Sequence, residues 1–123
     1  MLLKDGVNIK GVQPQVWYAI GFCDHLHQQM FGDSIVVTSL TDGQHNPGSK
    51  HPMGLAWDMR TKDRSASESA RFFQLVKEAL DKQGYDIVAE GGTNPSTPFT
   101  SGAHIHGEWD WHVGDADFFT RVT

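Results

Sequence analysis

The sequence predicts an α+β fold in which a small, mainly antiparallel sheet is backed by helices. Two segments repeat apolar residues at three- and four-residue spacing, which is typical of amphipathic helices. Four other segments are short and rich in β-branched or alternating apolar residues, which is typical of strands. With 123 residues and 38% hydrophobic content the chain can bury one core, so we expect a single domain over residues 1–123.

The first predicted helix begins at Pro14 and ends at Gly32. Proline is favoured in the first turn of a helix, and glycine is favoured just after the last turn. The apolar repeat between these residues includes Cys23, the single cysteine of the chain. One cysteine cannot form a disulfide within the chain, and we therefore expect it to be a small, buried apolar side chain.

The second predicted helix follows Ser65 and ends at Gly84. Ser65 and Glu68 have the spacing of a capping box, in which each side chain binds the backbone amide of the other residue. The apolar spacing predicts one face made of Ala70, Phe73, Val76, Lys77 and Leu80.

Four strands are predicted, over residues 34–38, 55–60, 85–90 and 104–111, so that each helix is followed by two strands. Alternate residues of a strand face opposite sides of its sheet. One face of the second strand therefore carries small and polar residues, which are Ala56, Asp58 and Arg60. The opposite face is expected to contribute core tryptophans, which are Trp57, Trp109 and Trp111.

Composition excludes several classes of partner. The formal net charge is -5, and no cluster of basic residues gives the footprint of a nucleic-acid-binding protein. Residues 1–6 introduce charge and glycine after two leucines, which fits neither a signal peptide nor a membrane span. We therefore expect a protein that is made in the cytoplasm, is monomeric, and binds neither nucleic acid nor membranes.

Histidines and acids gather in two regions of the chain. His51 ends a loop rich in glycine and proline, Asp58 follows on the polar face of a predicted strand, and a turn at Gly54 would bring the two side chains together. His104 and His106 lie on one face of the last predicted strand. Two histidines and one carboxylate with an open fourth position are typical of a catalytic zinc site.

These motifs resemble those of a known family. The pattern is Ser49-x-His51-x-x-Gly54-x-Ala56-x-Asp58 with a later His104-x-His106. It resembles the zinc D-Ala-D-Ala carboxypeptidase and L-alanyl-D-glutamate endopeptidase family, whose fold is shared with the hedgehog signalling domain. The resemblance covers about residues 38–110. Members with an upstream Thr-Ser-x-x-Asp-Gly-x-His stretch look closest, and it is matched here by Thr38, Ser39, Asp42, Gly43 and His45.

The resemblance implies a function as well as a fold. It implies that His51, Asp58 and His106 hold Zn²⁺ and that the protein cleaves peptide bonds in peptidoglycan stems. A phage or bacterial enzyme of this kind would act on the cell wall after release from the cell, as an endolysin does, or as a component of a virion.

The general base is left open by the motif, because Ala103 stands where many members of the family carry an acid. Glu90 ends a strand that we expect to pair with the strand of His104, so it is the first candidate. His104 itself is the second, as a base or, once protonated, as a donor to the oxyanion. Glu108 is the third, although it suits better the role of an acceptor that fixes the tautomer of a metal-bound histidine.

Substrate contacts are expected from cationic and hydroxyl side chains, because peptidoglycan stems carry free carboxylates. The candidates are Ser49, Arg60, Thr38 and His45, with Arg60 favoured if it lies on the face of Asp58. The long loop over residues 91–102 is expected to form a lid or a wall of the substrate site.

Two other functions remain open. The first is a non-catalytic, zinc-containing binding module or virion structural module with the same fold, and Ala103 favours it. A carboxylate within hydrogen-bond reach of the open metal position would favour the peptidase instead. The second is metal-dependent hydrolysis of an amide that is not a peptide.

Overall fold

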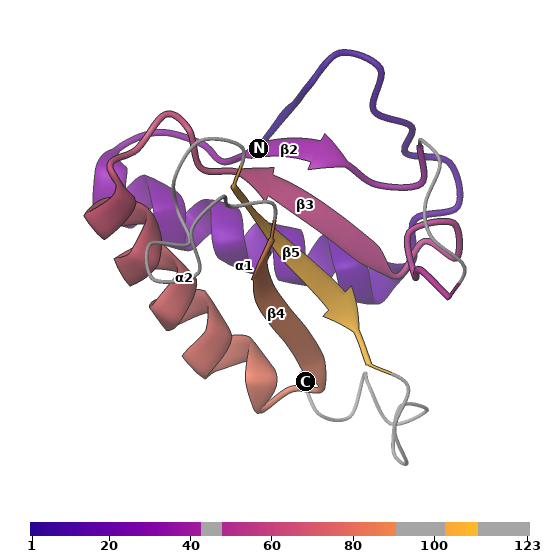
Figure 1. Cartoon of the computed structure of the whole chain (residues 1–123). Helices are drawn as coiled ribbons and strands as arrows, with labels where there is room; N and C mark the ends of the chain where they lie inside the picture. Colours follow the sequence, from indigo (N-terminus) through magenta and orange to yellow (C-terminus); the bar gives the residue numbers. More distant parts are fainter. Residues whose placement is uncertain (43–47, 91–102, 111–123) are drawn as a thin grey trace.

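A computed structural model describes residues 1–42, 48–90 and 103–110, and the structural statements below concern these residues. In chain order the elements are β1 (Leu2–Leu3), α1 (Pro14–Phe31), β2 (Val36–Ser39), β3 (Ala56–Arg60), α2 (Ala66–Asp81), β4 (Tyr85–Glu90) and β5 (His104–Trp109). Figure 1 shows the strands as one sheet with the two helices packed against it. The predicted α+β class is confirmed.

The sheet is mixed rather than purely antiparallel. Its strand order is β1-β2-β3-β5-β4. β1 pairs with β2 in parallel, whereas the β2–β3, β3–β5 and β4–β5 pairs are antiparallel. The sequence missed β1 because two residues are too few to show a periodic pattern. The predicted end of the last strand at residue 111 lies outside the described residues, and β5 itself ends at Trp109.

Both helices cover the same face of the sheet, and the core lies between them and the strands. The sheet contributes fully buried side chains at alternating positions, which are Val37, Trp57, Met59, Ile87, Ile105 and Trp109. The predicted core role of Trp57 and Trp109 is confirmed, and Trp111 lies outside the described residues. Because alternate residues point to opposite faces, the other face is free to carry polar side chains.

A glycine in β5 accommodates the largest of these core residues. Gly107 pairs with Trp57 across the β3–β5 ladder. A Cβ atom at Gly107 would lie 2.3 Å from the Trp57 ring, which is far inside van der Waals contact. The indole therefore packs directly on the backbone of the strand whose opposite face carries the histidines.

The predicted limits of α1 are confirmed. Pro14 occupies the first turn, and Gly32 ends the helix with φ of 80° while its amide donates to the Gln28 carbonyl at 2.8 Å. Cys23 is completely buried on this helix, as predicted, and burial raises the pKa of its thiol. No helix among the described residues is both long and apolar enough to cross a bilayer.

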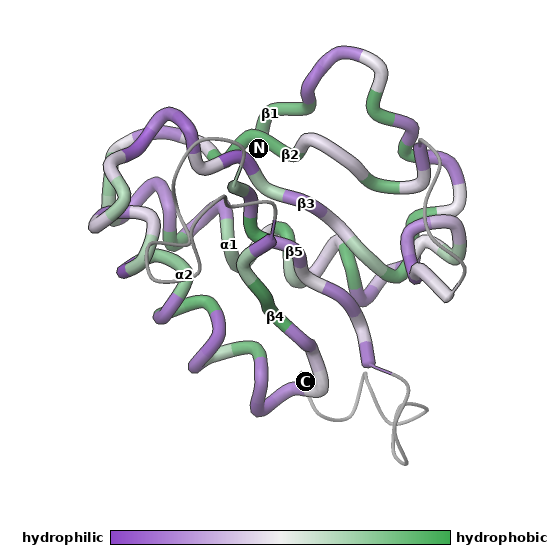
Figure 2. Tube along the Cα trace, in the orientation of Figure 1, coloured by the Kyte–Doolittle hydropathy of each residue, from purple (hydrophilic) through white to green (hydrophobic). Residues whose placement is uncertain are grey.

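The capping box of α2 is also confirmed, and so is the burial of Val76 and Leu80, but in the first half of the helix Ser69 and Phe72 are buried in place of the predicted Ala70 and Phe73. Ser65 Oγ accepts from the Glu68 amide at 3.1 Å, and Glu68 Oε1 accepts from the Ser65 amide at 3.0 Å. The buried side chains are Ser69, Phe72, Val76 and Leu80, and purple and green segments alternate along this helix in Figure 2. Adjacent phenylalanines made either face plausible, and contact with α1 decides for Phe72, whose ring lies 5.1 Å from the His27 ring.

Replacing Ser65 with alanine is expected to lower the free energy of unfolding by about 1 kcal/mol, because the Glu68 amide loses its acceptor. Urea denaturation measures this change. Ser65→Asp keeps an acceptor at the cap and serves as the matched control. Equal unfolding free energies for wild type and Ser65→Ala would show that the box does not stabilise the helix.

Candidate metal centre

Strand register gathers the predicted residues on the sheet face opposite the helices. Asp58 of β3 lies directly opposite His106 of β5, and Arg60 lies opposite His104. On the other side of β5, Glu90 of β4 also lies opposite His104. Directly paired residues share a face, so these five side chains form one polar surface across three strands.

His51 reaches this surface from the loop before β3, through the turn predicted at Gly54. The Gly54 amide donates to the His51 carbonyl at 2.9 Å, and Gly54 has φ of 74°. The imidazole is 3% exposed, and its Nδ1 donates to the Leu40 carbonyl at 2.7 Å. The remaining nitrogen, Nε2, therefore faces Asp58, with 3.4 Å between Nε2 and Oδ2.

His106 is fixed at both of its ring nitrogens. Its Nδ1 lies 2.9 Å from Asp58 Oδ1, and its Nε2 lies 2.8 Å from Glu108 Oε1. Glu108 is in turn 3.4 Å from the Lys50 ammonium. A carboxylate that accepts from Nε2 leaves Nδ1 to bind a metal, which is the role expected of Glu108.

These contacts shift two pKa values in opposite directions. Burial alone would raise the pKa of Asp58, but hydrogen bonds from His106 and His51 and the neighbouring imidazoles hold this pKa well below its usual range. Burial alone would lower the pKa of His106, but its bonds to Asp58 and Glu108 raise this pKa to about 9. The carboxylate is thus ionised, and it attracts a proton or another cation to the space between the imidazoles.

The donor atoms of His51, Asp58 and His106 fit a divalent ion. One nitrogen from each imidazole and one carboxylate oxygen lie within 4.8 Å of one another, and both histidines are buried. Nitrogen and carboxylate donors suit zinc, whose bonds to them are about 2.0–2.2 Å long. The structure therefore places a buried group that could hold a metal ion at the three predicted positions.

A second carboxylate lies on the solvent side of this group. Glu90 Oε1 is 3.2 Å from His104 Nε2 and 3.7 Å from His106 Nδ1, and the Glu90 side chain is 47% exposed. His104 Nε2 also lies 3.6 Å from Asp58 Oδ1. Asp58, Glu90 and His104 form a second group of donors close enough to hold an ion, and it shares Asp58 with the first.

Two of the four predicted substrate residues line a cavity next to the candidate metal group. Thr38 and Arg60 line a cavity of about 280 Å³ beside Asp58, and Arg60 is on the face of Asp58, as predicted. Ser49 Oγ accepts from the His51 amide at 3.3 Å, so it supports the loop that carries His51. His45 and the predicted lid over residues 91–102 lie outside the described residues.

Asp42, from the upstream stretch, has a structural role beside the site. Its Oδ1 accepts from the amides of Leu40 at 2.9 Å and Asn8 at 3.1 Å. It thereby fixes the turn whose Leu40 carbonyl binds His51. Burial alone would raise the pKa of Asp42, but these amide hydrogen bonds hold it below its usual value.

Asp42→Ala is expected to lower the free energy of unfolding by about 1–2 kcal/mol near neutral pH, because two amides lose their acceptor. A lowered pKa in the folded state means that the carboxylate contributes stability above its unfolded pKa of about 4 and loses it as the pH falls further. The difference between wild type and variant should therefore shrink below that pH, as urea denaturation in acidic and neutral buffers would measure. Asp42→Asn keeps an oxygen acceptor and should lose less; a difference independent of pH would contradict the role of the charge.

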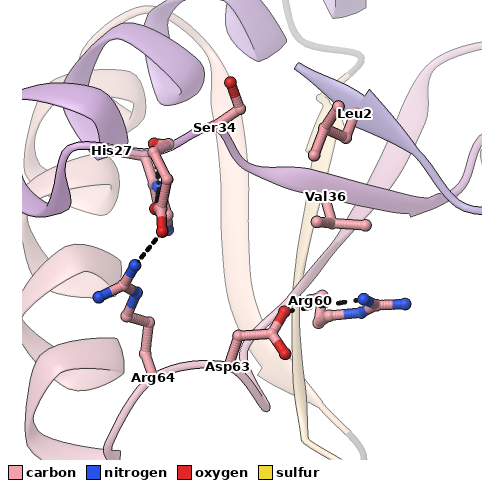
Figure 3. Close-up of a pocket in the computed structure, with 8 residues that line it drawn as sticks. Leu2, His27, Ser34, Val36, Arg60, Asp63 and Arg64 are labelled. Atoms are coloured by element: carbon pink, nitrogen blue, oxygen red, sulfur yellow. Dashed lines mark hydrogen bonds and ion pairs between the residues drawn. The ribbon is translucent and has the colours of Figure 1, made fainter.

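Arg60 also lines a second cavity, of about 230 Å³ (Figure 3). Its charged groups are paired with one another: Arg64 binds Asp33, and Arg60 Nη1 lies 3.7 Å from Asp63 Oδ2. The Arg64 guanidinium also stacks on the Phe31 ring at 4.6 Å. Arg64 thus ties the start of α2 to the end of α1.

The chain matches no protein-family model, and no curated protein matches it at a significant level. The residues of the site themselves define the chemistry that it can perform. They provide a buried set of metal donors in His51, Asp58 and His106, a solvent-facing carboxylate in Glu90, and an adjacent cavity. The sequence did not single out Lys4 and Lys62, which line that cavity.

Proposed function

We propose that this protein is a zinc metallopeptidase that cleaves peptidoglycan stem peptides, as an L-Ala-D-Glu endopeptidase or a D-Ala-D-Ala carboxypeptidase. The observation that carries the proposal is the buried His51–Asp58–His106 group with the Glu90 carboxylate beside it. The α+β architecture is compatible with a hedgehog-type fold, which is part of the proposal. The resemblance of the His51, Asp58 and His106 motifs to the zinc carboxypeptidase and endopeptidase family also favours a phage or bacterial source and action on the cell wall.

Zinc is the ion that the donor set favours. Two imidazoles and one carboxylate leave a coordination position for a substrate, which separates catalytic sites from closed structural ones. When bound there, the ion would supply Lewis acidity that polarises a scissile carbonyl and makes water more acidic. His51 and Asp58 would hold it from the loop and β3, and His106 would hold it from β5.

Glu90 is assigned as the general base. Its carboxylate is exposed enough for a water molecule to reach it and lies 3.7 Å from the Nδ1 of a proposed ligand, His106. A carboxylate in this position accepts a proton from the attacking water and returns it to the leaving amine. His104 Nε2, 3.2 Å from Glu90 Oε1, orients Glu90, and the same N–H is the donor for the oxyanion when it is not engaged with Glu90. The missing acid at Ala103 is thus replaced by one from the neighbouring strand.

Glu90→Gln is expected to reduce kcat by about 10²–10⁴-fold while leaving zinc content unchanged, because the amide cannot accept the proton. Kinetics on a stem peptide, with metal analysis of the same samples, measures both quantities. Asp86→Asn is the matched control, since Asp86 lies on the same face of β4 but opposite Glu108. Two zinc ions per chain, with Glu90→Gln losing one, would instead make Glu90 a ligand of a second ion.

Products decide between the peptidase and the alternatives. Peptidoglycan fragments incubated with zinc-loaded protein should give chelator-sensitive products by mass spectrometry, and their masses identify the bond that is cut. His51→Ala should abolish them. The alternative of a non-catalytic zinc module has Ala103 in its favour, and a folded, zinc-loaded protein that gives no product would support it. Cleavage of a non-peptide amide, without cleavage of peptides, would support metal-dependent hydrolysis of such an amide instead.

A further inference from the structure

The cavity beside the proposed zinc ligands is rich in cationic side chains. It has a volume of about 280 Å³ and is lined by Lys4, Thr38, Asp58, Arg60, Lys62, Ala103 and His104. Asp58 and His104 belong to the two candidate metal groups, so whatever enters the cavity lies next to the reacting centre. Three of the other lining residues are basic, in a chain whose formal net charge is -5.

Hydrogen bonds fix the chain at or next to the two lysines. The Lys4 amide donates to the Val37 carbonyl at 2.9 Å, which continues the parallel pairing of β1 with β2. Lys62 follows Thr61, whose buried hydroxyl donates to the Ala103 carbonyl at 2.8 Å. Lys4, after β1, and Lys62, after β3, thus line the same cavity, although 58 positions separate them in the sequence.

The positive charge of this cavity is poorly neutralised by the protein. Within the described part of the chain, neither Lys4 nor Lys62 forms an ion pair within 4.0 Å. Arg60 pairs with Asp63, but at 3.7 Å and with an exposed carboxylate. The Asp58 carboxylate already binds His51 and His106. A carboxylate from a ligand would therefore find two lysines that have no ion-pair partner among the described residues, beside an arginine that is shared with Asp63.

The opposite end of the site has a different charge. Lys50 donates to the Trp109 carbonyl at 2.9 Å and lies 3.4 Å from both Glu108 and Asp110. Two carboxylates thus share one cation there. A ligand across the site would meet lysines at one end and acids at the other, which fixes the end at which a negative group can lie.

We propose that Lys4 and Lys62, together with Arg60, bind a free carboxylate of the substrate and so restrict it to peptides with such a group adjacent to the scissile bond. This specificity rests on the proposed peptidase function. The carboxylate has two possible sources in a stem peptide: the C-terminus, or the α-carboxylate of a glutamate linked through its side chain.

Ligand binding tests the inference without requiring hydrolysis. Zinc-loaded protein is titrated calorimetrically with N-acetyl-D-alanine and N-acetyl-D-glutamine, each beside its α-amide. The first acid represents a C-terminus, and the second represents the α-carboxylate of a side-chain-linked glutamate. At least one acid should bind more tightly than its amide. The double variant Lys4→Gln/Lys62→Gln should bind that acid about tenfold more weakly than wild type does, and it should bind the amide with unchanged affinity.

A second double variant controls for net charge. Lys10→Gln/Lys82→Gln removes the same two charges from exposed positions that do not line the cavity, and the acid should bind to it as to wild type. Equal binding of acid and amide by wild type, or equal weakening by the two double variants, would overturn the inference even if peptidoglycan is cleaved. Weaker binding of the acid, but not of the amide, by Lys4→Gln/Lys62→Gln alone would support the inference even if no cleavage is found. Circular dichroism confirms that each variant is folded.

Discussion

Asp58→Asn is expected to weaken zinc binding by more than about 100-fold, the upper end of the loss seen when groups outside the ligand set are removed. Asp58 supplies the negative charge of the site: one oxygen lies 3.4 Å from His51 Nε2 and the other 2.9 Å from His106 Nδ1. Asparagine keeps the size of the side chain but offers a neutral oxygen or an amide donor. Competition with a chromophoric chelator measures the change in affinity.

Asp63→Asn provides the control for this experiment, because Asp63 is exposed and pairs with Arg60 outside the ligand set. It should bind zinc as tightly as wild type. The peptidase activity of Asp58→Asn should fall in proportion to its zinc content and recover partly when zinc is added in excess. An Asp58→Asn protein with wild-type zinc affinity would show that the metal lies elsewhere.

Gly54→Ala is expected to cost about 3 kcal/mol or more of unfolding free energy, the range of substitutions that force a clash in a packed site. Gly54 has φ of 74°, and a Cβ atom there would lie 1.9 Å from the Gly11 carbonyl oxygen. Relief of that clash must move the backbone of one segment. The Gly54 carbonyl accepts from the Gln13 amide at 2.9 Å, and its amide closes the turn with His51, so both bonds are at risk.

Gly48→Ala separates the two causes of this loss. Gly48 also has positive φ, at 87°, but nothing lies within 4 Å of a Cβ atom built there. Gly48→Ala should therefore lower the free energy of unfolding by about 1–2 kcal/mol, which is the cost of the left-handed conformation alone. Urea denaturation measures both variants, and chelator competition should show weaker zinc binding for Gly54→Ala, since His51 is displaced. Equal losses in the two variants would mean that the clash relaxes freely.

Much of the fold was predictable from local chemistry. Pro14 and Gly32 set the limits of α1, and Ser65 with Glu68 set the start of α2, because caps depend on a few neighbouring residues. What failed depended on tertiary contacts. The apolar spacing could not choose between two adjacent phenylalanines of α2. A strand of two residues such as β1 has no period to detect.

For the candidate site, the sequence predicted the metal donors but not the neighbouring cationic cavity. The spacing of His51, Asp58 and the His104-x-His106 pair indicated a metal site, and the family resemblance implied His106 as the ligand of that pair. The structure brings His51, Asp58 and His106 together. The sequence predicted that the strand of Glu90 pairs with the strand of His104, and the register of the pair, which the sequence did not predict, places the two residues opposite each other. The cationic cavity was not predictable, because Lys4 reaches it through β1, and no sequence pattern connects Lys4 with Lys62.

The shortness of β1 links substrate binding to local stability. β1 pairs with β2 at two positions, Leu2 with Val36 and Leu3 with Val37. The amides of Leu2 and Lys4 donate to the carbonyls of Ile35 and Val37 on the neighbouring segment, each at 2.9 Å. A segment paired at so few positions opens at a small fraction of the global unfolding free energy, and Lys4 leaves the cavity when it does. A carboxylate ligand that needs Lys4 binds only the closed state, so it must slow hydrogen exchange at these amides as its concentration rises.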